Sequence, residues 1–167
     1  MMMRLNLLDR FLEFVEEASD ELREVEPNES TVLLGDCNAD IGNDARVWMG
    51  VIGQNGNADV NDNARLLLQQ RYENALRIID TLFKDRYLHK YTRCRDFLGQ
   101  RSLIDFCIVS ADLFHSVLDV RVKTCVELLT DHHLVICNLH SEKPTGATQT
   151  FRARRSYLNK AGGDKDA

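Results

Sequence analysis

The stretch SLIDFCIV, residues 102–109, constrains the fold of this chain more than any other part of the sequence. Successive side chains of a strand point to opposite faces. Here one face carries Ile104, Phe106 and Ile108, and the other carries Asp105, Cys107 and Val109. A strand with one wet face alternates between apolar and polar residues, and this one does not. HLVICNL (133–139) is also largely apolar on both faces. The sequence therefore predicts strands buried on both sides, which requires a packed layer against each face.

The remaining chain is predicted to alternate between helices and short strands. Apolar residues at helical spacing, with acids between them, predict an amphipathic helix over 4–24. Its inner face is assigned to Leu5, Leu8, Leu12, Val15 and Leu22. A second helix is predicted over 62–75, capped by Asn61 or Asp62. Its inner side is assigned to Leu66, Leu67, Gln70 and Leu76.

Short strands complete the predicted fold. They are placed at 31–35, 76–79, 88–92, 102–109, 117–124 and 133–139. The segment 36–60 is rich in Asn, Asp and Gly and is expected to form an ordered loop or very short strands, anchored by Trp48, Val51 and Ile52. This order predicts an α/β fold, with a mostly antiparallel sheet covered by helices on one face.

Length and composition limit the class of protein. The 167 residues, 44% of them hydrophobic, supply one domain with a substantial core, placed at 1–142. The composition changes after Glu142, so 143–167 is predicted to be a disordered tail. No stretch approaches the about 18 apolar residues of a membrane span, and the beginning does not resemble a signal peptide. We therefore expect an intracellular protein, nuclear or cytoplasmic, that is neither secreted nor membrane-bound.

The cysteines and charges narrow the class further. Five Cys without CxxC spacing favour free thiols in a reducing compartment and argue against a zinc site. The net charge of −5 argues mildly against a nucleic-acid binder, whose contact face is usually basic. One segment is nevertheless basic, with tyrosines between the charges: Lys84, Arg86, Tyr87, Lys90, Tyr91, Arg93, Arg95 and Arg101. It predicts either an edge that contacts phosphates or a solvated loop.

Polar side chains interrupt the apolar strands at three places. Asp36 and Asn38 follow the first strand, Asp105 lies inside SLIDFCIV, and Asp131 and His132 precede the last strand. A buried carboxylate is costly unless it is paired, so Asp105 requires a partner. His132 suits it, because a carboxylate on one imidazole nitrogen leaves the other free to take a proton from water.

The other three side chains suggest a different task. Asp36, Asn38 and Asp131 offer oxygen ligands for a divalent cation and contacts for a phosphate oxygen. Taken singly, each feature also has a structural interpretation: Gly-Asp-x-Asn is a common turn sequence, and an acid inside a strand often forms an ion pair.

The order of these motifs resembles a known family. GDCNADIG, the Trp48–Gly53 stretch WMGVIG, HKYT with QRSLIDF, and TDHHLVIC are similar to the endonuclease/exonuclease/phosphatase superfamily. The closest resemblance is to the apurinic-endonuclease-like domain of LINE retrotransposons and the craniofacial-development-protein-like sequences. It covers about residues 5–140.

The resemblance implies metal-dependent hydrolysis of phosphodiesters, with Mg²⁺ or Mn²⁺ as cofactor and DNA as substrate. It implies that His132 is the general base and that Asp105 orients it. Asp36 and Asn38 would bind and polarise the scissile phosphate. Asp131 and Asp36 would bind the metal.

The departures from the family matter as much as the matches. Cys37, Asp40 and Arg93 replace residues that are usually apolar, His and Trp. The family fold is a two-layer α/β sandwich of two similar halves, and this chain resembles the second half only. We therefore expect the first half, with its metal-binding Glu, to be absent, leaving a sheet face exposed to self-association and catalysis impaired by truncation. Two alternatives stay open: another phosphodiester substrate, such as a phosphoinositide or free nucleotide, and a non-catalytic relic or binding module.

Overall fold

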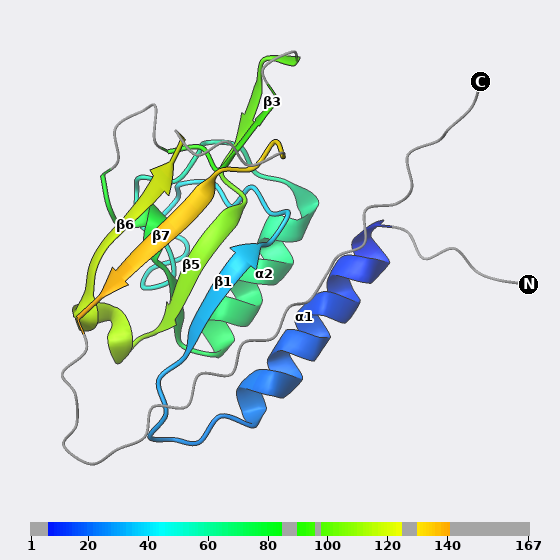
Figure 1. The fold of residues 1–167 in the computed structure, drawn as a ribbon. Coiled ribbons are helices and arrows are strands. Elements are labelled where there is room, and N and C mark those ends of the chain that lie inside the picture. Colours follow the sequence, from blue (N-terminus) through cyan, green and yellow to red (C-terminus); the bar gives the residue numbers. More distant parts are fainter. Residues whose placement is uncertain (1–6, 85–89, 96–97, 125–129, 141–167) are drawn as a thin grey trace, which may run out of the picture.

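The computed structural model describes residues 7–84, 90–95, 98–124 and 130–140. Its elements are, in chain order, α1 (Leu7–Arg23), β1 (Val32–Asp36), α2 (Asp62–Glu73), β2 (Leu76–Ile78), the 3-10 helix η1 (Ile79–Thr81), β3 (Arg93–Arg95), β4 (Gln100–Ser102), β5 (Asp105–Ser110), the 3-10 helix η4 (Leu113–Ser116), β6 (Val117–Lys123) and β7 (Leu134–Leu139). Figure 1 shows their arrangement. The segment predicted to be a disordered tail, 143–167, lies outside the described residues.

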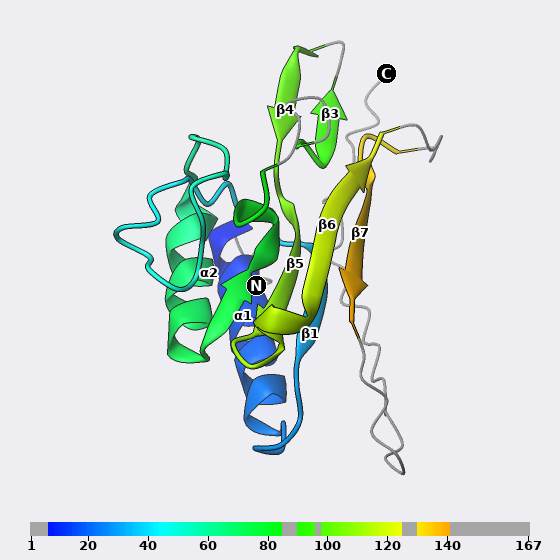
Figure 2. The ribbon, with the colours of Figure 1, turned by 90° about the vertical axis from the view of Figure 1, so that its left-hand side faces the viewer.

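The strands form antiparallel groups in front of the two helices. Hydrogen bonds join β1, β5 and β2 in that order, β3 with β4, and β6 with β7. The β6–β7 pair lies next to β5, on the side away from β1 (Figure 1), and both helices lie on one side of the strands (Figure 2). This confirms the predicted α/β class with antiparallel strands and helices on one face. The strands are divided among three sheets instead of forming one.

Strand β5 is buried on both faces, as its sequence predicts. Phe106 and Ile108 belong to a core cluster shared with the helices, whereas Cys107 and Val109 belong to a second cluster shared with β6. The strand predicted at 133–139 is present as β7, but its predicted burial on both faces is wrong, because every residue of β7 is half-buried or exposed. The reason is position, because β7 lies beyond the reach of the helices and has β6 as its hydrogen-bonded neighbour.

An apolar part of the sheet remains uncovered. Val32 and Leu34 of β1 are paired in register with Val109 and Cys107, and therefore share the face directed away from the helices. Leu34 is 66% exposed, and Val32 is also classed as exposed. Leu33, which points the opposite way, packs against the core. One face of the first strand is thus covered by helices and the other is open.

The inner face of α1 differs from the prediction. Leu8 and Leu12 are exposed, whereas Phe11 is buried and is accompanied inward by Val15 and Leu22. Residues 11, 15 and 22 are spaced by four and seven, so they lie on one side of a helix, and Leu8 and Leu12 lie toward its edges. Leu5 lies outside the described residues.

Helix α2 confirms most of its prediction. Asn61 is the cap, and its side chain accepts a hydrogen bond from the N–H of Ala64 at 3.2 Å. Leu67 and Gln70 are buried as expected. The burial of Arg71, which is 2% exposed, was not predicted, because a charged residue on a helix usually lies in water.

The strand predicted at 88–92 is wrong where it can be compared. Residues 88–89 lie outside the described residues, and 90–92 are not a strand. The strands of this region are β3 and β4, which form a hairpin that extends beyond the other strands (Figures 1 and 2). Their sequences, RCR and QRS, are too short and too polar to give a period-two signal.

The described residues bear on two predictions made from composition, those on the cysteines and on membrane-spanning helices. Of the cysteines among them, Cys37, Cys107 and Cys137 are free thiols. Cys107 and Cys137 lie in β5 and β7, the strand positions expected of them. Among the described helices, none is both long enough and apolar enough to cross a bilayer.

Gly50 and Gly53 should respond differently to substitution. A Cβ on Gly53 would lie 2.3 Å from the backbone oxygen of Thr81, whereas Gly50 has open space but a φ of +84°. Gly53→Ala should lower the free energy of unfolding by about 1–3 kcal/mol through overpacking. Gly50→Asn should cost less than about 1 kcal/mol, because Asn tolerates the left-handed region. Urea denaturation measures both, and equal losses would contradict this account.

Candidate active site

Two carboxylates meet where β1 ends and β5 begins. Antiparallel pairing places Asp36, the last residue of β1, directly opposite Asp105, the first residue of β5. Two like charges this close are unfavourable unless a cation or donor lies between them. The pKa of Asp36 is raised, first by burial and then by the neighbouring charge of Asp105. The register therefore creates a site that attracts a positive group.

His132 supplies a group that carries a positive charge when it is protonated. It lies in the turn before β7, whose first residues reach the same upper end of the sheet in Figure 1. Its Nδ1 lies 2.9 Å from Oδ2 and 3.1 Å from Oδ1 of Asp105, and its Nε2 lies 3.9 Å from Oδ2 of Asp36. The hydrogen bond to Asp105 raises the pKa of His132 most, and burial opposes it. The imidazole is thus oriented by one carboxylate and directed toward the other.

The loop after β1 holds Asp36 and Asn38 in place. The backbone N–H of Asn38 donates to Oδ1 of Asp36 at 2.8 Å, and Asn38 has a left-handed φ of 45°. The carbonyl of Asn38 accepts hydrogen bonds from the side chains of Asn61 (3.1 Å) and Asn63 (2.9 Å), at the start of α2. These contacts use only the backbone of Asn38. Its side-chain carboxamide makes no hydrogen bond with any other described residue.

Asp131 lies beside this group and has other partners. Its Oδ2 accepts from Nε of Arg93 at 2.9 Å and from Nε of Arg95 at 3.1 Å. The hydrogen bond from Arg93 is the main reason that the pKa of Asp131 is lowered. Its Oδ1 lies 3.8 Å from Nε2 of His132. The structure therefore brings Asp36, Asp105 and His132 together and places Asp131 at their margin, in an ion pair with two arginines.

Thr92 connects the segments of the site and was missed by sequence reasoning. Its hydroxyl, fully buried, accepts the N–H of Ile104 at 3.1 Å and of Asp105 at 3.0 Å. Its carbonyl accepts the N–H of His133 at 2.7 Å. One threonine thus positions the strand that carries Asp105 and the turn that carries His132. A lone Thr in a single sequence gives no signal of such a role.

The donor set fits a divalent cation in type. Ligand atoms of Asp36, Asp105 and His132 lie within 4.8 Å of one another. Hard cations such as Mg²⁺ prefer carboxylate oxygens. Asp105 and His132 are already bonded to each other, so Asp36 is the member of this group most available to a metal. The side chain of Asp36 is 36% exposed, so a ligand can reach it from solvent.

The chain is similar to solved structures that include nucleases and a phosphatase. The chain matches the endonuclease domain of TRAS1, a telomere-specific non-LTR retrotransposon, with a TM-score of 0.56 and 17% identity over 80% of this chain and 53% of that one. It also matches the 3'-5' exonuclease NExo from Neisseria meningitidis, with a TM-score of 0.52 and 20% identity over 78% of this chain and 52% of that one.

A third match is a structure of NExo, described as a 3' phosphatase bound to a product DNA hairpin, with a TM-score of 0.52 and 19% identity over 78% of this chain and 52% of that one. No family model and no curated protein matches the sequence. The chain spans about half the length of these solved structures. It therefore shares part of the fold of these solved structures.

Thr92→Val should destabilise the protein more than Thr92→Ser. Valine leaves the N–H groups of Ile104 and Asp105 without their acceptor in a buried place, which should lower the free energy of unfolding by about 1–3 kcal/mol. Serine keeps the oxygen and loses a methyl group, worth about 0.8 kcal/mol. Urea denaturation of the two variants compares them directly. If both variants lose the same free energy of unfolding, the hydroxyl of Thr92 is not the group that stabilises this region.

The pKa of His132 should fall in Asp105→Asn. The substitution removes the negative charge that holds this pKa above its ordinary value of 6.5. In the native protein, folding favours the protonated imidazole. The resulting stability is therefore complete below about pH 6.5 and is lost as the pH rises through the folded-state pKa. NMR titration of the imidazole measures the shift, with Asp119→Asn on β6 as the control. An unchanged titration in Asp105→Asn would refute the pairing.

Proposed function

We propose that this site hydrolyses phosphodiester bonds of DNA, with Mg²⁺ or Mn²⁺ as cofactor, as an endonuclease of LINE retrotransposon type. The observation that carries the proposal is the His132–Asp105 pair, at 2.9 Å, directed at the carboxylate of Asp36. A histidine oriented by a carboxylate is an arrangement suited to general-base catalysis.

In this mechanism His132 activates the attacking water. With Nδ1–H donating to Asp105, the neutral imidazole presents a bare Nε2 toward Asp36. Nε2 takes a proton from the water as its oxygen bonds to phosphorus and the bond to the leaving ester oxygen breaks. Asp105 then stabilises the imidazolium. Because the hydrogen bond to Asp105 raises the pKa of His132, the imidazole is a stronger base.

Asp36 and Asn38 act on the phosphate in this proposal. The carboxamide of Asn38, which makes no hydrogen bond to another described residue, is available to donate to a phosphate oxygen. Asp36, fixed by the N–H of Asn38, would hold the metal ion. When bound, a divalent cation there neutralises charge that develops on the phosphate oxygens. The sequence also predicts Asp131 as a metal ligand. We do not propose it as one, because its Oδ2 accepts hydrogen bonds from Arg93 and Arg95.

The solved structures support DNA as the substrate class. One is a retrotransposon endonuclease domain, and another is a phosphatase bound to a product DNA hairpin. Together with the GDCNADIG and TDHHLVIC motifs, they favour the retrotransposon branch over a phosphoinositide or nucleotide phosphatase. We also propose an intracellular, nuclear or cytoplasmic location, in keeping with DNA as partner.

We further propose that the chain on its own is a weak catalyst. Among the described residues, Asp36 is the carboxylate of the cluster left open to a metal, whereas Mg²⁺ prefers octahedral coordination. A site with few protein ligands should bind the ion weakly and stay accessible to water. The exposed side of β1, with Val32 and Leu34, should promote self-association, because apolar surface in water seeks a partner.

A second candidate function is a DNA-binding module without catalysis. The same shortage of metal ligands around Asp36 favours it. Both candidate functions require DNA binding, but only the first requires DNA cleavage, so a cleavage assay distinguishes them.

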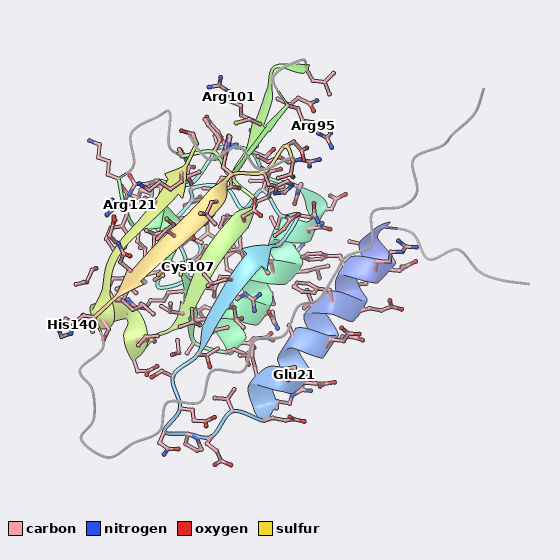
Figure 3. The ribbon with its side chains drawn as sticks, viewed as in Figure 1. Glu21, Arg95, Arg101, Cys107, Arg121 and His140 are labelled. Carbon is pink, nitrogen blue, oxygen red and sulfur yellow. The ribbon has the colours of Figure 1, made fainter. Side chains whose placement is uncertain are left out.

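Nicking of supercoiled plasmid tests the proposal. With Mg²⁺ or Mn²⁺ we expect slow nicking that EDTA abolishes. His132→Ala should reduce it about 10²- to 10⁴-fold, the usual contribution of a general base. His140→Ala is the matched control, since His140 lies past β7, at the opposite end of the sheet (Figure 3). The half of a retrotransposon endonuclease domain that this chain does not match, added as a separate polypeptide, should raise the rate of nicking.

Two outcomes decide between the candidates. Nicking that His132→Ala and His140→Ala leave equally unchanged would overturn the catalytic assignment. DNA binding without nicking at any metal concentration, even with the added segment, would favour the binding module.

A further inference from the structure

Two arginines share a single carboxylate oxygen beside the candidate active site. Nε of Arg93 and Nε of Arg95 lie 2.9 and 3.1 Å from Oδ2 of Asp131. The pairing brings two positive charges to the one carboxylate of Asp131, and the charge of Arg93 also acts to lower the pKa of Asp36 and of Asp40, which burial raises. A simple structural ion pair needs only one of these arginines. The second suggests that the group serves to attract an anion.

Among the described residues, the remaining donors of both guanidinium groups have no acceptor, so a ligand could bind them. Each guanidinium has five N–H donors, and the contact with Asp131 uses the one on Nε. No other described residue accepts a hydrogen bond from either arginine. The side chains of Arg93 and Arg95 are 23% and 39% exposed. Within the part of the chain that the structure describes, the terminal nitrogens are therefore positioned by Asp131 without a hydrogen-bond acceptor of their own.

The hairpin fixes the two arginines on one face. Residues 93 and 95 are separated by two along β3, so their side chains project from the same side of the strand. The backbone N–H of Cys94 donates to the carbonyl of Asp131 at 2.9 Å, and Arg93 forms a β-bridge with His132. Figure 3 shows Arg95 on this projecting hairpin. The arginines thus adjoin the His132–Asp105 pair.

We propose that Arg93 and Arg95, aligned by Asp131, form a binding site for a phosphate of a nucleic-acid strand next to the one at His132. This inference rests on the proposed function. Guanidinium groups bind phosphate oxygens through paired, charge-assisted hydrogen bonds. Because Asp131 already orders the two side chains, a phosphate pays less of their ordering entropy on binding. Asp131 is then a positioning residue for the arginines, and the basic segment around them contacts phosphate through this pair.

The chemistry of the ligand is a phosphate oxyanion, and a strand supplies it better than a free ion. The protein as a whole is acidic, with a net charge of −5, so free anions are repelled overall. A strand bound at His132 presents its neighbouring phosphate at high effective concentration. Free phosphate has no such second contact and should bind weakly.

Fluorescence anisotropy with a labelled single-stranded oligonucleotide, in EDTA, tests the site without catalysis. Arg93→Gln and Arg95→Gln should each weaken binding about tenfold, the loss of one charged hydrogen-bonding group. Each should also reduce the slope of log affinity against log salt by about one. Arg23→Gln is the matched control, because Arg23 is paired with Asp20 on the remote end of α1 and is exposed. It should bind like wild type.

The outcomes separate this inference from the proposed function. Single substitutions leave the other arginine on Asp131, and thermal unfolding checks that the variants fold. His132→Ala should still bind DNA, so loss of nicking with retained binding concerns catalysis alone. Arg93→Gln and Arg95→Gln that bind like Arg23→Gln would overturn the site. Competition by inorganic phosphate or a mononucleotide at the same concentration as the oligonucleotide would overturn the assignment to a strand.

Discussion

The antiparallel pairing of β1 with β5 is the constraint on which the site depends. Its register sets Asp36 opposite Asp105, and a shift of one residue would send one of these side chains to the other face. Two facing carboxylates need a positive partner, and His132 provides it from a turn well separated in sequence. The apolar clusters on both faces of β5 hold that register. Packing in the core therefore determines the electrostatics at the end of the sheet.

Around this pair the chain builds a second, polar network, which begins at the buried Thr92. Thr92 ties the backbone at Asp105 to the turn at His133, and Asp131 ties the β3–β4 hairpin to the same turn. The hairpin is consequently a fixed extension of the site. A phosphodiester strand placed at His132 would meet oriented arginines instead of flexible ones.

The fold explains why the same residues suit both weak catalysis and binding. The chain spans about half the length of the nucleases that it matches, and its open β1 face carries Val32 and Leu34. The residues proposed as general base and as phosphate contacts lie together within the described residues, whereas Asp36 is the carboxylate of the cluster left open to the proposed metal. Since metal charge is a large part of the stabilisation in such reactions, the shortage bears more on rate than on affinity.

The sequence by itself determined the elements with strong local signals: the capped helix after Asn61, the two-sided strand at Phe106, and the order of the acid and His motifs. It also predicted that Asp105 needs a partner, because an acid inside an apolar strand is costly alone. Tertiary structure decided the rest. It directed Phe11 inward in place of Leu8 and Leu12, left β7 half open, and formed a hairpin from strands too short and polar to be recognised. It also engaged Asp131 with arginines. These outcomes depend on contacts between segments distant in sequence, and local periodicity carries no information about which distant neighbour a side chain will meet.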